Sequence, residues 1–244
     1  MCEKQCLSSI IHVSSKIGAN TVVESYFEGE KPTEICENAE IGSLCYVATG
    51  VKVNRNSKIE HGSIVLNDVP PYAIVRGNPA VIIGYTHTLH REIVHEHKLD
   101  NKKSGRHITG VKGVTIHVMP EIPDFRGYLS VGEIAKDIPF EVKRYFLVYK
   151  VPGKEVRGEH AHKECHQFLI CVAGSGHVIV DDGKKAEEIK LDTPNVGIHI
   201  APGVWGIQYK FTQDAVLLVF ASENYDSGDY IREYDEFLKW LMTN

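Results

Sequence analysis

The sequence has no hydrophobic run long enough to cross a membrane. Its longest apolar stretch, residues 215–221, is far shorter than the ~20 residues that a transmembrane helix needs. The opening residues, Met-Cys-Glu-Lys-Gln-Cys, contain no apolar core of a secretory signal. We therefore expect a cytoplasmic protein with no membrane partner.

Long runs of positive charge and closely paired cysteines are also missing. The chain of 244 residues has a formal net charge of −5 and no extended Lys/Arg segment, which argues against a nucleic-acid partner. Its 6 cysteines form no CxxC pair, so zinc-ribbon and redox motifs are not indicated, and reduced, buried thiols are expected. The length fits one large domain or two of ordinary size.

A six-residue repeat fills the first third of the chain. Isoleucine or valine occupies every position except Gly29 in the series Ile11, Ile17, Val23, Gly29, Ile35, Ile41, Val47, Val53, Ile59 and Val65. Two residues before each lies a series of mostly small side chains: Ser9, Ser15, Thr21, Phe27, Thr33, Ala39, Cys45, Val51, Ser57 and Ser63. Helices and ordinary strands have shorter periods, so this repeat predicts a short left-handed parallel β-helix of triangular cross-section, with the aliphatic series pointing inward. Both series fail at residues 26–31, where we expect an extruded loop or an irregular corner before the repeat returns to phase.

The end of the repeat resembles a known family. Residues 68–80, Asp-Val-Pro-Pro-Tyr-Ala-Ile-Val-Arg-Gly-Asn-Pro-Ala, are similar to the closing sequence of hexapeptide-repeat acyltransferases. That resemblance implies a trimer that binds acyl-coenzyme A between subunits, and it carries over Arg76 and Gly77 as contacts to the coenzyme. The histidines available as a base are His61 and His12. A module that only trimerises, without acyl transfer, is the alternative.

A polar stretch follows the repeat. At residues 87–110 the hexad pattern gives way to histidines, lysines and turn formers around one short apolar stripe, which predicts a helix and then a linker. The predicted organisation is therefore a β-helix at 1–86, a helix and linker at 87–110, and a second domain at 111–244.

The second domain shows short β-type runs separated by turns. These runs lie at residues 113–119, 142–151, 168–172, 177–180, 196–200 and 216–221. Such spacing predicts a β-sandwich or small barrel. A helical pattern is found only at the end, at residues 230–241, where we expect a helix that caps the barrel.

One segment of this domain concentrates ionisable side chains. It reads Arg-Gly-Glu-His-Ala-His-Lys-Glu-Cys-His-Gln at residues 157–167. If the strand continues that far, His160, His162, Glu164 and His166 share one face, because alternate residues of a strand do so. Clustered imidazoles can bind a metal ion, or act as acids and bases near neutral pH.

This segment resembles the first metal-binding signature of the cupins. The second cupin signature corresponds to residues 201–208, where Gly206 stands at the place of the last histidine ligand. His160, His162 and His166 therefore form an incomplete ligand set. We expect no bound metal, and we expect the histidines to act directly as acid and base.

Most of residues 111–241 resembles the cupin-type ketoisomerases that interconvert 4-keto and 3-keto forms of a dTDP-linked 6-deoxyhexose. The matching segments are residues 124–129, 138–144, 157–163, 178–183, 191–194 and 221–237. The resemblance implies a jelly-roll (double-stranded β-helix) barrel acting on dTDP-4-keto-6-deoxyglucose. It also implies a place in the biosynthesis of a 3-amino-3,6-dideoxyhexose for a surface polysaccharide, such as an O-antigen or S-layer glycan.

The family's histidine pair carries over to His160 and His162, with neither assigned as base or acid. Moving the ketone requires removal of the C3 proton, an enediolate, and return of a proton to C4, and imidazole can perform such transfers at neutral pH. The resemblance and side-chain chemistry give these substrate-binding candidates: Arg126, Arg144, Tyr145, Arg157, His166, Trp205 and Tyr209. Arginine suits the pyrophosphate or the enediolate oxygen, and an aromatic side chain could stack on thymine.

Isomerisation of this kind needs no cofactor, and acetyl-CoA is expected only if the first domain is an active sugar N-acetyltransferase. Two other functions stay open, a metal-dependent cupin oxygenase and a non-enzymatic protein that binds sugar nucleotides. The two resemblances together imply a homo-oligomer, with trimers through the β-helix, dimers through the cupin and a hexamer as the combined assembly.

Overall fold

The computed structural model describes residues 6–7, 9–27, 30–86, 104–152 and 155–244. Its contacts divide the chain into two compact units, Met1–His90 and Arg91–Asn244, and each unit is described by itself. The helix predicted after residue 87 falls on residues 87–103, which lie outside the described residues. Within the described part of the chain, no helix is long and apolar enough to cross a membrane.

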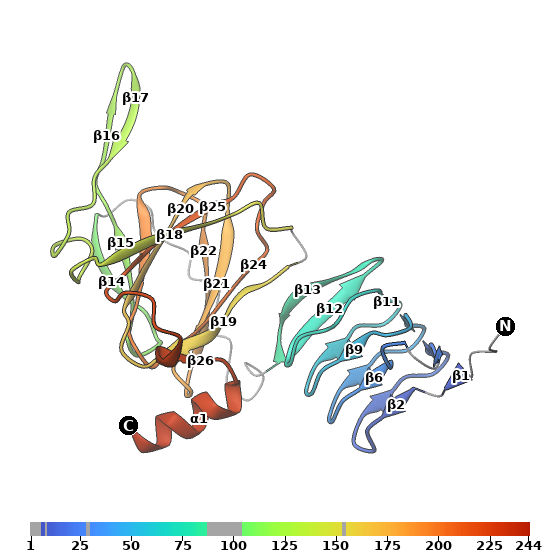
Figure 1. The fold of residues 1–244 in the computed structure, drawn as a ribbon. Coiled ribbons are helices and arrows are strands. Elements are labelled where there is room, and N and C mark those ends of the chain that lie inside the picture. The colour runs from blue at the N-terminus through green and yellow to red at the C-terminus, as the bar shows by residue number, and fades with distance from the viewer. Residues whose placement is uncertain (1–5, 8, 28–29, 87–103, 153–154) are drawn as a thin grey trace. The chain divides into compact units, whose positions relative to one another are not determined.

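The first unit is a parallel β-helix whose short strands stack into three sheets (Figure 1). One sheet contains β3 (Lys16–Ile17), β7 (Glu40–Ile41), β10 (Lys58–Ile59), β12 (Ala73–Gly77) and β13 (Ala80–Tyr85). The second contains β4 (Val22–Val23), β8 (Tyr46–Val47) and β11 (Ile64–Val65), and the third contains β2 (Ile10–Ile11), β6 (Glu34–Ile35) and β9 (Lys52–Val53). Successive coils pair in parallel, while β12 and β13 form an antiparallel hairpin. This arrangement confirms the β-helix predicted from the six-residue repeat.

The two residue series of the repeat line the interior of this unit. The aliphatic positions Ile35, Ile41, Val47, Val53, Ile59 and Val65 are buried, as are the small positions Thr33, Ala39, Cys45, Val51, Ser57 and Ser63. Ile11 and Ile17 belong to the aliphatic series but are 47% and 39% exposed. They differ because they lie in the first coil, which among the described residues stacks on only one neighbouring coil.

The loop predicted at residues 26–31 is visible in the strand register. There β5 (Tyr26–Phe27) pairs antiparallel with β1 (Cys6–Leu7), outside the three sheets. As a result Ile11 pairs with Ile35, one hexad further along the chain than the repeat requires. The next coil returns to the regular spacing, because Ile35 pairs with Val53.

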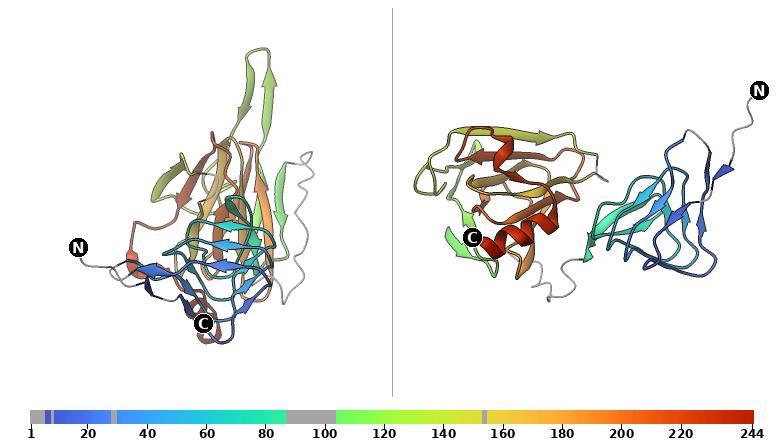
Figure 2. Two further views of the ribbon diagram at one scale, coloured as in Figure 1. Left: turned by 90° about the vertical axis from the view of Figure 1, so that its right-hand side faces the viewer. Right: turned by 60° about the horizontal axis from the view of Figure 1, so that its bottom comes forward.

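The second unit contains two antiparallel sheets that face each other. The six-stranded sheet has the order β14 (Gly105–Ile108), β15 (Val114–Val118), β23 (Val196–Ile200), β20 (Gln167–Ala173), β25 (Val216–Ala221) and β18 (Arg144–Tyr149). The five-stranded sheet has the order β22 (Ala186–Leu191), β21 (Gly176–Asp181), β24 (Trp205–Tyr209), β19 (Arg157–His162) and β26 (Tyr230–Ile231). A separate hairpin, β16 (Glu121–Asp124) and β17 (Gly127–Ser130), projects from this unit, as the left view of Figure 2 shows.

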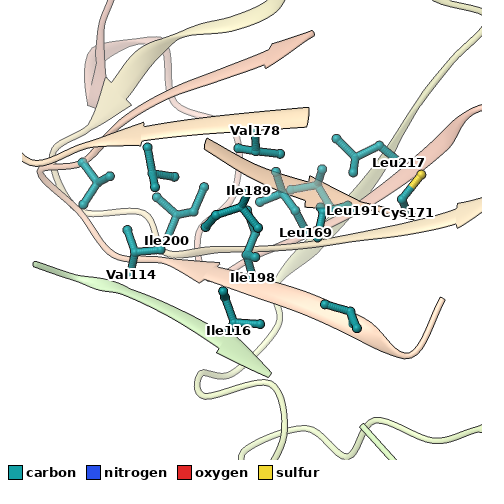
Figure 3. Close-up of a cluster of buried hydrophobic side chains, with 14 of the residues drawn as sticks. Val114, Ile116, Leu169, Cys171, Val178, Ile189, Leu191, Ile198, Ile200 and Leu217 are labelled. Carbon is teal, nitrogen blue, oxygen red and sulfur yellow. The ribbon is translucent and has the colours of Figure 1, made fainter. Parts of the chain in front are cut away.

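Aliphatic side chains from both sheets fill the space between them. Figure 3 shows Leu169 and Ile198 of the six-stranded sheet close to Ile189 of the five-stranded sheet, and all three are fully buried. The helix α1 (Tyr234–Thr243) follows the last strand and packs near β19 and β26. The all-β architecture with one C-terminal helix agrees with the prediction.

One detail of the sequence prediction is wrong, and another is confirmed. Gly105–Ile108 was expected to be linker, but it forms β14 and pairs along its whole length with β15. Its residues gave no strand pattern because an edge strand is largely exposed and tolerates polar side chains. The cysteines Cys36, Cys45, Cys165 and Cys171 are free, as predicted, and all but Cys36 are buried.

Candidate active site

The histidine pair lies on β19 and points into the space between the two sheets. His160 pairs with Gly206 of β24, and paired residues of neighbouring strands share a face. A bulge interrupts β19 between Gly158 and His160. Gly158 has a φ of +83°, and a Cβ there would stand 2.7 Å from the carbonyl oxygen of Gly206. A glycine is therefore required where the chain turns to present the pair.

Hydrogen bonds fix both imidazole rings. Nδ1 of His160 lies 2.9 Å from the carbonyl oxygen of Gly158, and Nδ1 of His162 lies 2.6 Å from Oδ2 of Asp229. The two Nε2 atoms face each other at 3.2 Å. Since a carbonyl and a carboxylate only accept hydrogen bonds, each Nδ1 carries a hydrogen and each Nε2 is available for proton transfer.

Asp229 is held in place by the turn that follows β19. It ends the short 3-10 helix η2 (Ser227–Asp229), and its Oδ1 accepts the backbone N–H groups of Lys163 and Glu164 at 2.9 and 2.7 Å. Burial alone would raise the pKa of this carboxyl group, but the bonds from His162 and these amides outweigh burial and lower it. Asp229 is therefore an ionised partner that orients His162.

Burial keeps both histidines neutral. It lowers the pKa of His160 to about 4, against a smaller opposite effect of the Gly158 carbonyl. Burial also lowers the pKa of His162, although the bond to Asp229 works in the other direction. At neutral pH the pair is therefore a proton acceptor rather than an imidazolium.

Aromatic and cationic side chains line one side of the pair. The ring of Tyr230 lies 4.9 Å from that of His160 and 4.4 Å from that of His162. Arg232 is stacked over Tyr230 at 4.4 Å, and Arg144 lies over the ring of Tyr225 at 5.6 Å. Both arginines disfavour protonation of His162, so two fixed positive charges stand close enough to act on an anion bound beside the pair.

Arg144 also has an unused donor. It lies on the inward face of β18, since it shares its strand alternation with the core residues Phe146 and Val148. Its Nε is buried and has no hydrogen-bond partner within the described residues. A buried donor of this kind is ready for an anionic ligand.

A small cavity adjoins the histidines. It has a volume of about 10 Å³, room for about one water molecule. Its walls include Cys165, Gln167 and Gln208 besides the pair itself. This polar interior contrasts with the aliphatic packing elsewhere between the sheets.

The metal-ligand arrangement of the cupins is not formed by the predicted residues. His166 is turned away from His160 and His162, because the chain bends at residues 163–166 instead of continuing as a strand. It bonds His199 at 2.9 Å and lies against Phe140 on the opposite face of the six-stranded sheet. This corrects the expectation that His166 joins the site.

A different set of potential ligand atoms does come together. Atoms of His162, Cys165 and Asp229 lie within 4.8 Å of one another. His162 and Asp229 already bond each other through one nitrogen and one oxygen. The geometry is thus that of a His–Asp dyad with a thiol nearby.

The aromatic candidates of β24 also lie elsewhere. Trp205 is 4% exposed and packs against Tyr234 and Phe237 of α1. Tyr209 is buried beside His177. Both occupy the face of β24 opposite Gly206 and Gln208, so the prediction that they stack on thymine is not supported.

The remaining candidates lie at the surface. Tyr145 is 67% exposed on the outward face of β18, opposite to Arg144. Arg157 is exposed at the start of β19, on the inward-facing side with Gln208. Arg126 lies at the tip of the β16–β17 hairpin and bonds Asp124 at 2.5 Å. Within one chain the structure therefore joins Arg144, but neither Tyr145 nor Arg126, to the histidine pair.

In the first unit the predicted residues form no such cluster. Arg76 is exposed on β12, and Gly77 beside it has a φ of +106°. His61 is exposed in a turn, where its Nδ1 accepts the backbone N–H of Ser43 at 2.8 Å. His12 is also exposed and contacts Ser14.

The sequence interpretation missed Asp229, Gln167, Tyr230 and Arg232. Three of them lie within the segment 221–237, which carried the resemblance to the ketoisomerases, but no local pattern linked them to the histidines. The register supplies that link, because His162 pairs with Tyr230 across β19 and β26.

Comparison with known proteins identifies the second unit. Residues 112–242 match the family described as "FdtA: WxcM-like, C-terminal". The chain belongs to the FdtA family. A TDP-4-oxo-6-deoxy-alpha-D-glucose-3,4-oxoisomerase of Aneurinibacillus thermoaerophilus is 46% identical over 121 residues, 50% of this chain and 87% of that protein. The FdtA-family part of the chain thus covers most of this relative, which confirms the predicted resemblance.

The second unit is also similar to solved structures, and the first unit is similar to a different group of proteins. The sugar 3,4-ketoisomerase QdtA of Thermoanaerobacterium thermosaccharolyticum, solved in complex with TDP, has a TM-score of 0.52 and 39% identity, over 54% of this chain and 96% of that one. A 2,3,4,5-tetrahydropyridine-2,6-dicarboxylate N-acetyltransferase of Brevibacillus brevis is 33% identical over 69 residues, 28% of this chain. The match spans 29% of that acetyltransferase, so the FdtA-family chain shares with it the repeat rather than the whole protein.

Proposed function

We propose that the second unit is a sugar-nucleotide 3,4-ketoisomerase that acts on dTDP-4-keto-6-deoxyglucose. One observation carries the proposal: two neutral imidazoles, with His162 buried and His160 half-buried, present their Nε2 atoms 3.2 Å apart, with both Nδ1 atoms held by acceptors. Such a pair can accept a proton from one carbon and return it to the next. The names of the 46% identical relative and of QdtA support the same reaction and substrate class.

The geometry suits the individual steps. His160 and His162 remove the C3 proton and return a proton to C4, and Asp229 stabilises the positive charge that forms on His162. The free donor of Arg144 and the guanidinium of Arg232 suit the enediolate oxygen or the pyrophosphate. The ketone moves between neighbouring carbons without a net change in oxidation state, so we expect no cofactor.

The deciding experiment uses His162→Asn. Incubated with dTDP-4-keto-6-deoxyglucose, the wild type should yield the 3-keto sugar by NMR, and His162→Asn should not, while both bind TDP and melt at similar temperatures. His177→Asn is the matched control, because His177 bonds Glu188 on the other face of the sheet and should keep turnover. Full activity of His162→Asn would refute the assignment.

A metal-dependent oxygenase is the competing function. A chelator should leave ketoisomerisation unchanged, and elemental analysis should find no stoichiometric metal. Loss of activity on chelation, restored by one metal, would favour the oxygenase. If the wild type bound TDP without turning over the sugar, a non-enzymatic binding protein would be the better description.

Acetyl transfer by the first unit is a second candidate. Its β-helix and its 33% identity to an N-acetyltransferase favour this activity, with His61 as the candidate base and with Arg76 and Gly77 as contacts to acetyl-CoA. Thiol release from acetyl-CoA in the presence of a dTDP-3-amino-3,6-dideoxyhexose tests it. No release would support the alternative, a module used for assembly.

We further propose a cytoplasmic homo-oligomer that supplies a sugar for a surface polysaccharide. Trimers through the β-helix and dimers through the second unit would combine into a hexamer. Light scattering tests the assembly, and a monomer would contradict it.

A further inference from the structure

Gln167 connects the two sheets at the histidine pair. It is the first residue of β20 in the six-stranded sheet, is 6% exposed, and reaches His162 of the five-stranded sheet. Its Nε2 lies 3.0 Å from Nε2 of His162. The amide therefore contacts the nitrogen that faces His160 and that is available for proton transfer.

The hydrogens in this cluster can be counted. Nδ1 of His162 donates to Asp229, and a neutral imidazole carries one hydrogen, so Nε2 of His162 has a free lone pair. An amide NH₂ group donates, which matches that lone pair. With the amide turned round, its oxygen would instead accept a hydrogen from Nε2, and His162 would then be an imidazolium.

We propose that Gln167 is a positioning residue that donates to Nε2 of His162 and holds it without a proton, so that the pair begins the reaction as a base with no proton on either Nε2. This inference rests on the proposed ketoisomerase function. It adds the starting state of the pair: the proton later delivered to the sugar is not stored on either Nε2 before substrate binds.

The surroundings support this state. Among the described residues, the charged groups near His162 are Asp229 on η2, Arg144 on β18 and Arg232 after β26. Its titratable neighbours are His160 on β19 and the thiol of Cys165 in the turn that follows. Asp229 fixes the hydrogen on Nδ1 of His162, and the positive charges of the two arginines disfavour a second hydrogen on its Nε2. His160 offers no hydrogen toward His162, since its own Nδ1 donates to Gly158. Gln167 is the neutral donor that matches the lone pair on Nε2 of His162.

The test begins with the wild type. In ¹⁵N-histidine-labelled protein at pH 7, with His162→Asn for assignment, the Nε2 resonance of His162 should be that of an unprotonated nitrogen and Nδ1 should carry the hydrogen. A hydrogen on Nε2 would overturn the proposal. This measurement does not depend on turnover, so an unprotonated Nε2 in a protein that fails to convert the sugar would refute only the proposed function.

Substitutions at Gln167 then test the contribution of its side-chain amide. Gln167→Glu places an acceptor at the same position and should favour the imidazolium form of His162, moving the acid limb of the kcat/KM pH profile upward by at least one pH unit. Gln208→Glu is the matched control, because Gln208 lines the same cavity and its side chain stands on β24 rather than on β20. Equal shifts in the two variants would show a charge effect alone and would overturn the role of the hydrogen bond.

A neutral variant covers the case in which Gln167→Glu does not fold. Gln167→Met removes the donor with little change in volume, and the Nε2 resonance of His162 should shift, with a smaller upward movement of the acid limb. An unchanged resonance and an unchanged pH profile would mean that Gln167 only fills space.

Discussion

Asp229→Asn gives the sharpest test of the proposed histidine chemistry. Oδ1 of Asp229 accepts two backbone N–H groups, while Oδ2 accepts Nδ1–H of His162 at 2.6 Å. An asparagine would keep its oxygen on the backbone amides and turn its NH₂ group toward His162. Nδ1 would then have to accept a hydrogen bond, which moves the ring hydrogen to Nε2 and blocks the proton acceptor.

The size of the effect follows from the bond that is lost. A hydrogen bond to a charged partner contributes ~1.5–3 kcal/mol, so kcat/KM should fall between about 10-fold and about 150-fold. Asp229 also raises the pKa of His162, and its removal should move the acid limb of the pH profile to lower pH. Product formation from dTDP-4-keto-6-deoxyglucose, followed by NMR across pH, measures both.

A control variant separates this effect from a general loss of charge. Asp226 is exposed and accepts the backbone N–H of Gly228 at 2.8 Å, a cap that asparagine can also provide. Asp226→Asn should therefore retain near wild-type activity. If Asp229→Asn stayed within about 2-fold of the wild type, the His–Asp dyad would have no part in the reaction.

Three further outcomes are expected. Arg144→Ala should raise KM for the sugar nucleotide at least several-fold in steady-state kinetics, while Tyr145→Ala on the outward face of the same strand should not, and equal effects would contradict the placement of Arg144 in the site. Ile189→Ala should destabilise the second unit by ~2–5 kcal/mol in denaturant unfolding, because Ile189 is fully buried between the sheets. Burial lowers the pKa of His160 and of His199 to about 4, below ~6.5 in the unfolded chain. Because the unfolded chain then binds more protons, the stabilisation should be complete above about pH 6.5 and should fall toward pH 4. Equal melting temperatures at pH 7.5 and pH 5 would argue against histidines that folding keeps neutral.

The sequence determined the parts of the structure that depend on short-range periodicity. The hexad repeat placed Ile35 and its equivalents in the interior of the β-helix, and its break at residues 26–31 matches the extruded β5. The repeat did not predict burial in the first coil correctly, because the exposure of Ile11 depends on what covers that coil rather than on the repeat. Alternation on β19 likewise put His160 and His162 on one face, but it failed at His166, where the strand had already ended.

Only the tertiary structure decided what surrounds the histidine pair. Asp229 and Gln167 reach His162 from distant parts of the chain, and no local pattern relates their positions. The face of β24 that looks inward was equally undetermined, because both faces of that strand are buried and its composition does not reveal which side holds Gly206 and which holds Trp205. Periodicity fixes which residues share a face; the pairing of strands and the packing of one sheet on the other fix what that face meets.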